Sequence, residues 1–294
     1  MKTISIPNSV QLNFDVINYI LNNVALVPPQ DEDSEVCFDF NKNTWLSSEM
    51  TTFLGIIFRD LQMNNYTVYV TGFSYKLSNL LKKNGFLSHF KLSENIPDTY
   101  GTTIPFIELR PEQTKTLDEY LNNILFTKMD EKINLSENEI IKSAIYELTH
   151  NIKEHSRAGL FFMCGQFFPQ KNELTFSIAD AGISIPDNII ECNGPQFNCK
   201  SQYIDWATNK GTTTKTNSVG GLGLYDIKEN LRPIGDLKIL SGNGYAEFNS
   251  NKNVFLKDTK NRFNGTMIYL KYDLNAILNI PTQINDSETE FFQF

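Results

Sequence analysis

Apolar and polar positions along residues 1–92 follow two spacing patterns that alternate along the chain. Short apolar runs of strand length alternate with stretches in which apolar residues recur every three to four positions. The runs predict strands at 3–6, 36–40 and 67–71, and the spaced stretches predict helices at 14–27, 47–63 and 75–84. Strands separated by helices of this length form parallel crossovers, so this part of the chain is predicted to be a small α/β sandwich.

The pattern changes after residue 92. A connector, 93–130, contains one predicted strand and one predicted helix, at 104–109 and 112–129. Residues 131–273 begin with a long helix, 136–156, and then become rich in strands, with two further helices at 201–208 and 225–231. The strands are predicted at 160–168, 173–179, 236–241, 246–249, 254–257 and 266–272. The first two are expected to be neighbours joined near 169–172, and the tail 274–294 has no predicted element.

The helix at 136–156 is the most strongly specified element. Ser136 and Glu139 have the spacing of a capping box, which starts a helix. One face is apolar and is predicted to pack inward through Ile140, Ala144, Ile145, Leu148 and Ile152. Glu147 and Asn151, four residues apart, lie one turn above the other, although Asn prefers caps and turns. This pair is either part of a solvated polar face or a nucleotide site, with Asn151 binding magnesium and Glu147 polarising a water.

Charge and cysteine content narrow the function classes. The chain has 26 basic and 34 acidic residues, a net charge of -8 and no basic tract, which argues against nucleic-acid binding and membrane anchoring. We expect a soluble, cytoplasmic protein, since no apolar run approaches membrane-spanning length. Cys37 and Cys164 lie in strand-like runs and are expected to be buried thiols, while Cys192 and Cys199 flank a loop without histidine partners for a metal.

Four separate motifs now occur in a fixed order along residues 131–273. They are ELTHN (147–151), DAGISIP (180–186), KGTTTK (210–215) and GGLGL (220–224). In order and spacing they resemble the ATP-binding motifs of the GHKL superfamily, the Bergerat-fold ATPases that include the histidine kinases. The resemblance implies a two-layer α/β sandwich that binds ATP and Mg²⁺.

The resemblance also implies a role for each motif. Asp180 would accept a hydrogen bond from the adenine amino group, and Gly182 would let the backbone approach the base. Asn151 would bind Mg²⁺, and Glu147 would orient or deprotonate the attacking nucleophile. The remaining nucleotide contacts would come from the lid and the glycine-rich helix start, at Lys215, Gly220, Gly221, Leu222, Gly223 and Leu224. Ser184 stands where the adenine motif usually has a second glycine.

A second resemblance covers residues 1–92. The stretches VCFDFNKNTWLSSEMTTFLGIIFRDL and VYVTGFSYKLSNLLKKNGFLSHF resemble STAS-type domains, the fold of anti-sigma-factor antagonists. In those proteins a Ser or Thr at the start of a helix accepts phosphate from a partner kinase, and Ser47 and Ser48 fall at the matching place. Leu46 and Glu49 replace the usual flanking Asp and Gly, so we expect one of the two serines to cap the helix instead.

Several functions are compatible with this pairing of domains. The expected function is a magnesium-dependent ATPase that acts as a regulatory switch and uses its STAS-like domain to dock a protein partner. The first alternative is a Ser/Thr protein kinase resembling anti-sigma factors that acts on a STAS-like domain. The second is a nucleotide-dependent scaffold without useful turnover. A sensor histidine kinase is not expected, because the helix at 112–129 contains no histidine. A homodimer is left open.

Overall fold

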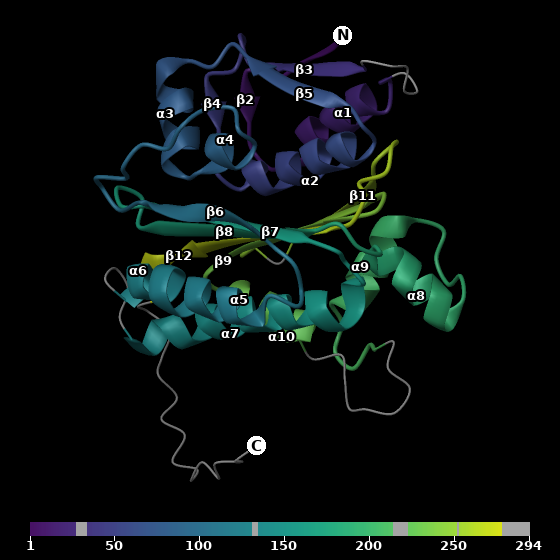
Figure 1. Cartoon of the computed structure of the whole chain (residues 1–294). Helices are drawn as coiled ribbons and strands as arrows, with labels where there is room; N and C mark the ends of the chain where they lie inside the picture. The colour runs from purple at the N-terminus through teal and green to yellow at the C-terminus, as the bar shows by residue number, and fades with distance from the viewer. Residues whose placement is uncertain (28–33, 131–134, 214–222, 252, 278–294) are drawn as a thin grey trace.

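The chain folds into three layers, as a computed structural model shows (Figure 1). Residues 1–27, 34–130, 135–213, 223–251 and 253–277 are described, with the backbone alone at 135–138. The described part of residues 1–92, called the N-terminal unit below, forms one outer layer. A seven-stranded sheet forms the middle layer, and helices on its opposite face form the third.

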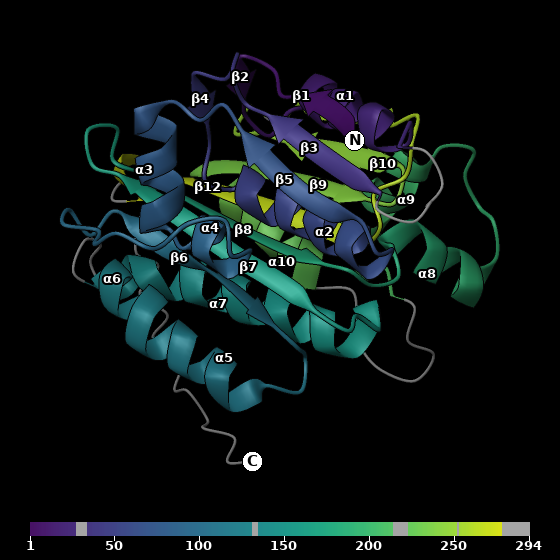
Figure 2. The ribbon, with the colours of Figure 1, turned by 45° about the horizontal axis from the view of Figure 1, so that its top comes forward.

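The N-terminal unit has a parallel sheet of strand order β1-β3-β5. Its strands are β1 (Lys2–Ser5), β3 (Glu35–Asp39) and β5 (Thr67–Thr71), and its helices are α1 (Phe14–Val24), α2 (Met50–Met63), α3 (Tyr75–Lys83) and α4 (Phe86–His89). The predicted parallel crossovers are confirmed, and Figure 2 shows the three strands above α2. A short parallel pair, β2 (Ser9–Val10) with β4 (Trp45–Leu46), was not predicted, and neither was α4.

Helix α2 begins three residues later than predicted. The pairing of β2 with β4 continues to Ser47, whose N–H donates to the Val10 carbonyl at 3.0 Å. This bond holds Ser47 in the extended segment, so the first helical residue is Met50. Glu49 is the N-cap, and it makes no side-chain capping bond. The expectation that Ser47 or Ser48 caps this helix is therefore wrong.

The middle layer is antiparallel throughout, with strand order β11-β10-β9-β12-β8-β7-β6. Its strands are β6 (Thr103–Leu109), β7 (Phe161–Phe168), β8 (Glu173–Asp180), β9 (Gly235–Ser241), β10 (Gly244–Phe248), β11 (Val254–Asp258) and β12 (Thr266–Asp273). The expected neighbours β7 and β8 pair directly, with Phe161 opposite Asp180. Strand β6, from the connector, forms one edge of this sheet.

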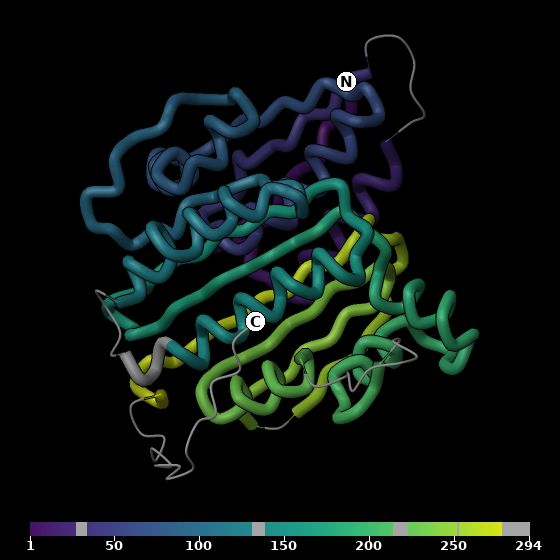
Figure 3. Tube along the Cα trace, turned by 60° about the horizontal axis from the view of Figure 1, so that its bottom comes forward, coloured from purple at the N-terminus to yellow at the C-terminus, as the bar shows by residue number. Residues whose placement is uncertain are grey.

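Helices cover one face of the seven-stranded sheet and enclose a core with it. They are α5 (Thr114–Tyr120), η1 (Leu121–Phe126), α6 (Thr127–Asp130), α7 (Leu135–Asn151), η2 (Ile152–Ser156), α9 (Lys200–Ala207), α10 (Gly223–Leu231) and α11 (Leu274–Ile277), while α8 (Ile185–Asn193) packs on α9 beside the sheet. Figure 3 brings this side forward and shows the helices crossing in front of the strands. The predicted helix at 112–129 corresponds to α5, η1 and α6, with a π-helical middle that periodicity does not reveal.

The N-terminal unit packs on the other face of the same sheet through α2. Residues 50–58 of α2 are all buried, which is the pattern of a helix enclosed on every side. Phe53 stacks on Phe263 with ring centroids 5.5 Å apart, and the Thr52 hydroxyl donates to Ser177 of β8 at 3.0 Å. The predicted single apolar face was therefore incomplete, because α2 packs between two sheets and joins them in one continuous core.

Two polar side chains are enclosed where α2 meets the sheet. Ser48 is fully buried and Glu49 is 4% exposed. The Ser48 hydroxyl and the Glu49 Oε2 atom have no hydrogen-bond partner among the described residues. Burial raises the pKa of the Glu49 carboxyl above its ordinary value, and bonding to Ser47 only partly opposes this. The junction between the two units is therefore closed to solvent at the two residues that precede Met50.

Candidate functional site

Helix α7 places Glu147 and Asn151 at the edge of the core. The predicted inward face is confirmed, with Ala144, Ile145 and Leu148 buried. Glu147 and Asn151 are both half-buried and border this face along the helix. Within the described chain neither side chain makes a hydrogen bond or an ion pair, so both polar groups are available to a ligand.

Glu147 is accessible from a solvent-filled hollow. The hollow has a volume of about 700 Å³ and runs between α7 and η1, where Lys142, Tyr146 and His150 line it beside Glu147. A smaller cavity of about 80 Å³ separates α7 from α10, and Glu147 lines that cavity as well. Water can therefore reach the carboxylate from the hollow while the other side of the carboxylate faces the start of α10.

The helix changes its hydrogen-bonding pattern directly after Asn151. Residues Ile152–Ser156 form a π-helical turn, and Arg157 follows with a left-handed φ of 52°. The Ser156 hydroxyl donates to the Ile152 carbonyl at 2.7 Å and accepts from the Ala158 N–H at 3.1 Å. π-Turns often occur at functional sites, and this one ends the helix within one turn of Asn151.

Asp180 is the last residue of β8 and lies in the middle of the sheet. It is paired with Phe161 on one side and Thr266 on the other, and it is 4% exposed. Its Oδ1 atom accepts a hydrogen bond from the Gly182 N–H at 2.9 Å. Burial raises the pKa of the Asp180 carboxyl to about 7, although the bonds from Gly182 and Ser156 act in the opposite direction. The predicted position of Asp180 at a strand end is confirmed.

The loop after Asp180 is bound to the end of η2. The Ile183 N–H donates to the Ser156 carbonyl at 2.6 Å. A Cβ atom on Gly182 would lie 2.1 Å from the same carbonyl oxygen, so only glycine fits there. Contact with Ser156 therefore explains Gly182 without any ligand. No sequence pattern identifies Ser156, because its contact with this loop is made by its backbone carbonyl.

Ser184 has a structural role that the motif comparison did not anticipate. It is buried and is the N-cap of α8, where its hydroxyl accepts from the Asp187 N–H at 3.2 Å and donates to Asp187 Oδ2 at 2.6 Å. Asp187 also pairs with Arg262 at 2.5 Å. Burial alone would raise the pKa of Asp187, but Ser184 and Arg262 outweigh it and hold the pKa below its ordinary value. Helix α8 itself was not predicted.

The last motif brings the start of α10 against α7. Gly223, the first residue of α10, lies so close to Glu147 that a Cβ there would be 1.8 Å from Glu147 Oε1. Leu224 packs against the core. Lys215, Gly220, Gly221 and Leu222 lie outside the described residues. Before them, the Thr212 hydroxyl donates to the carbonyls of Trp206 and Asn209, both at 2.8 Å.

Lys228 is a buried cation that the sequence did not single out. It lies on α10, is 5% exposed and donates to Asn209 Oδ1 at 3.4 Å. Burial lowers the pKa of its ammonium group, and neighbouring Arg232 adds to the effect. The ammonium also lies over the rings of Tyr225 and Phe248. A lysine in a helix of mixed polarity gives no sequence signal of burial.

Two of the described side chains have the chemistry that the predicted ATP and Mg²⁺ would need. A buried carboxylate suits the adenine amino group, and the unbonded Asn151 amide suits magnesium, which takes few protein ligands. No group of three or more His, Cys, Asp or Glu side chains is placed to hold a metal in the described part of the chain. Cys37 and Cys164 are free and buried as predicted, and Cys192 and Cys199 are free and exposed.

Comparison with known proteins gave no family assignment. No protein-family model and no curated protein sequence matches the chain. Among the described helices, none is both long and apolar enough to cross a membrane.

Proposed function

We propose that the protein binds ATP with Mg²⁺ and acts as a nucleotide-dependent regulatory switch of the GHKL type. One observation carries the proposal. Two motif segments distant in sequence meet the continuous helix of α7 and η2 on either side of Asn151: the loop after β8 contacts Ser156, and the start of α10 contacts Glu147. Sequence motifs that matched by chance would not be expected to contact the same helix.

Each described residue has a defined task in this proposal. The Asp180 carboxylate accepts the adenine amino hydrogen, a charge-assisted bond that guanine cannot make in the same place. The Asn151 amide oxygen binds Mg²⁺, which neutralises the phosphate oxygens when bound. The backbone at Gly223 presents the N-terminal end of α10 to the phosphates. Glu147 orients the nucleophile, which reaches it from the hollow beside α7.

The N-terminal unit supports docking over phosphorylation within one chain. We propose that it is STAS-like, since parallel strands β1, β3 and β5 alternate with helices. Ser47 and Ser48 are 6% and 0% exposed against the sheet. A kinase site could reach them only after α2 separated from β7 and β8. The protein-kinase alternative therefore applies to a separate STAS-like partner, and the scaffold alternative applies if turnover is absent.

Calorimetry on the full chain tests the binding step. ATP with Mg²⁺ should bind the wild type, and Asn151→Ala should weaken binding most strongly when Mg²⁺ is present. Asn193→Ala is the matched control, since Asn193 is exposed at the end of α8. Equal ATP affinity for Asn151→Ala and the wild type would rule out the magnesium assignment.

The fate of the phosphate separates the three functions. After incubation with ATP and Mg²⁺, free phosphate with an unmodified chain indicates an ATPase. Phosphate transferred to an added STAS-domain protein, detected by intact mass, indicates a protein kinase. Binding without either product indicates a scaffold.

A further inference from the structure

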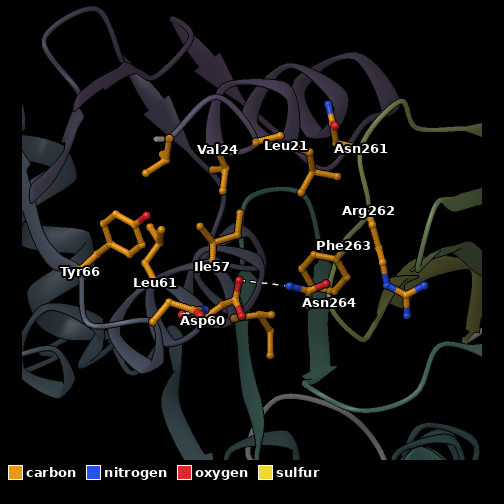
Figure 4. A pocket seen from close by; sticks show the side chains of 14 residues that line it. Leu21, Val24, Ile57, Asp60, Leu61, Tyr66, Asn261, Arg262, Phe263 and Asn264 are labelled. Atoms are coloured by element: carbon orange, nitrogen blue, oxygen red, sulfur yellow. Dashed lines mark hydrogen bonds between the residues drawn. The ribbon is translucent and has the colours of Figure 1, made fainter. Parts of the chain in front are cut away.

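A further cavity lies on the side of the sheet opposite α7, between the N-terminal unit and the loop that joins β11 to β12. Its volume is about 490 Å³, within the range of small-molecule sites. Leu21 and Val24 of α1, Ile57 of α2 and Phe263 of the loop give it apolar walls, and Asp60 and Asn264 lie at one side (Figure 4). The cavity therefore combines apolar walls with several polar groups, of which Asp60 and Asn264 lie together at one side, called the polar end below.

The polar end carries an unbalanced negative charge. Asp60 is half-buried, and its Oδ2 atom accepts a hydrogen bond from the Asn264 amide at 3.1 Å. No basic side chain in the described ranges forms an ion pair with it. Arg262 also lines the cavity, but its guanidinium pairs with Asp187 at 2.5 Å and lies apart from Asp60 in Figure 4. The cation nearest in sequence to Asn264 is thus already neutralised.

We propose that this cavity binds a small molecule that carries a protonated amine on an apolar body. The apolar walls would cover the body, and the ammonium group would donate to Asp60 in a charge-assisted hydrogen bond. An anionic ligand would meet the Asp60 charge without a free cation to compensate it. A neutral ligand would leave the carboxylate without an opposite charge. The site is separate from the proposed nucleotide site and does not depend on it.

Three probes of one shape test the charge preference on the full chain. They are 2-phenylethylamine, 2-phenylethanol and 3-phenylpropanoate, titrated at pH 7 and followed by ligand-observed NMR. The amine should bind about 10- to 100-fold more tightly than the alcohol, the factor expected of a hydrogen bond to a charged group. The carboxylate probe should bind most weakly.

Two variants locate the site. Asp60→Asn should reduce amine affinity to that of the alcohol, whereas Asp118→Asn, an exposed change of equal charge on α5, should leave the preference intact. Val24→Trp should fill the cavity and weaken binding of the amine and the alcohol alike. Circular-dichroism melting of each variant establishes that the fold is kept.

The outcomes are decisive in both directions. An amine preference that Asp60→Asn abolishes and Asp118→Asn preserves supports the inference. Equal binding of amine and alcohol, a preference that survives Asp60→Asn, or no binding of any probe at millimolar concentration overturns it.

Discussion

The carboxylate of Glu147 occupies the space that a side chain at position 223 would need. Built on Gly223, a Cβ atom would lie 1.8 Å from Glu147 Oε1 and 2.4 Å from its Cδ. The start of α10 and the candidate catalytic carboxylate are therefore fixed relative to one another by direct contact. A side chain added at position 223 would therefore displace Glu147.

Gly223→Ala should therefore disturb both stability and turnover. The added methyl group must push Glu147 aside, and overpacking of this kind costs about 1–3 kcal/mol. Urea denaturation measures the stability loss, and phosphate release measures turnover. Gly159→Ala is the matched control, because a Cβ at Gly159 meets no atom within 4 Å. If Gly223→Ala and Gly159→Ala lose stability and turnover equally, the contact between position 223 and Glu147 does not cause the losses.

Glu147→Gln should separate ATP binding from catalysis. The amide keeps the shape of the side chain against Gly223 but cannot take a proton, so the rate of phosphate release should fall about 10²- to 10⁴-fold. ATP affinity measured by calorimetry should stay within a few-fold of the wild type. Unchanged phosphate release would remove Glu147 from the mechanism.

Asp180 should make nucleotide binding pH-dependent. Because burial raises its pKa to about 7, the carboxyl becomes protonated as the pH falls through 7 and loses its ability to accept the adenine amino hydrogen. ATP affinity should therefore drop below pH 7 in the wild type. In Asp180→Asn the affinity should be lower at pH 8 and nearly independent of pH. Calorimetry at pH 6, 7 and 8 distinguishes the two profiles.

The same carboxyl should make the folded protein less stable as the pH rises, whereas it makes ATP binding stronger. Between its ordinary pKa of 3.8 and the folded value of about 7, the folded state holds a proton that the unfolded state has released. The contribution of Asp180 to the free energy of unfolding should thus decrease by about 1.4 kcal/mol per pH unit as pH rises through this window. Chemical denaturation of the wild type and Asp180→Asn at pH 5 and pH 7 measures the difference between their free energies of unfolding at each pH. A constant difference would contradict the raised pKa.

A negative charge at Ser48 should destabilise the junction between the N-terminal unit and the sheet. Ser48→Asp would place a second carboxylate beside the buried Glu49, and an uncompensated buried charge costs about 3–5 kcal/mol. Chemical denaturation should show the loss, whereas Ser250→Asp, in an exposed turn, should be near neutral. Similar stability of both variants would show that the junction opens readily enough to admit charge.

Sequence reasoning predicted the elements that depend on local periodicity. The strands of the two larger sheets and the apolar face of α7 follow directly from the spacing of apolar residues. Helix α8 was missed although its start signals are present, since Ser184 is an N-cap and Pro186 lies in the first turn. In the sequence the same residues also form the end of the predicted nucleotide motif, DAGISIP.

The errors and gaps arise from contacts distant in sequence. The start of α2 depends on the bond between Ser47 and Val10, and the fit of Gly182 depends on the carbonyl of Ser156. The two-sided burial of α2 depends on β8, where Ser177 accepts from Thr52 across 125 positions. Periodicity within a window of one helix contains no information on such partners. The cavity beside Asp60 likewise forms only where α1, α2 and the loop after β11 meet.

The position of α2 between two sheets has a consequence for how the chain is made. Its second face packs on β7 and β8, which begin at residues 161 and 173, long after α2 ends at Met63. At a synthesis rate of about 5–20 residues per second, on the order of 10 s pass between the synthesis of α2 and that of β7 and β8. The nascent N-terminal unit therefore exposes the side of α2 around Gly55, which later packs against Phe106 and Phe162. During that interval the growing chain exposes an apolar helix surface of the kind that favours aggregation, until β7 and β8 cover it.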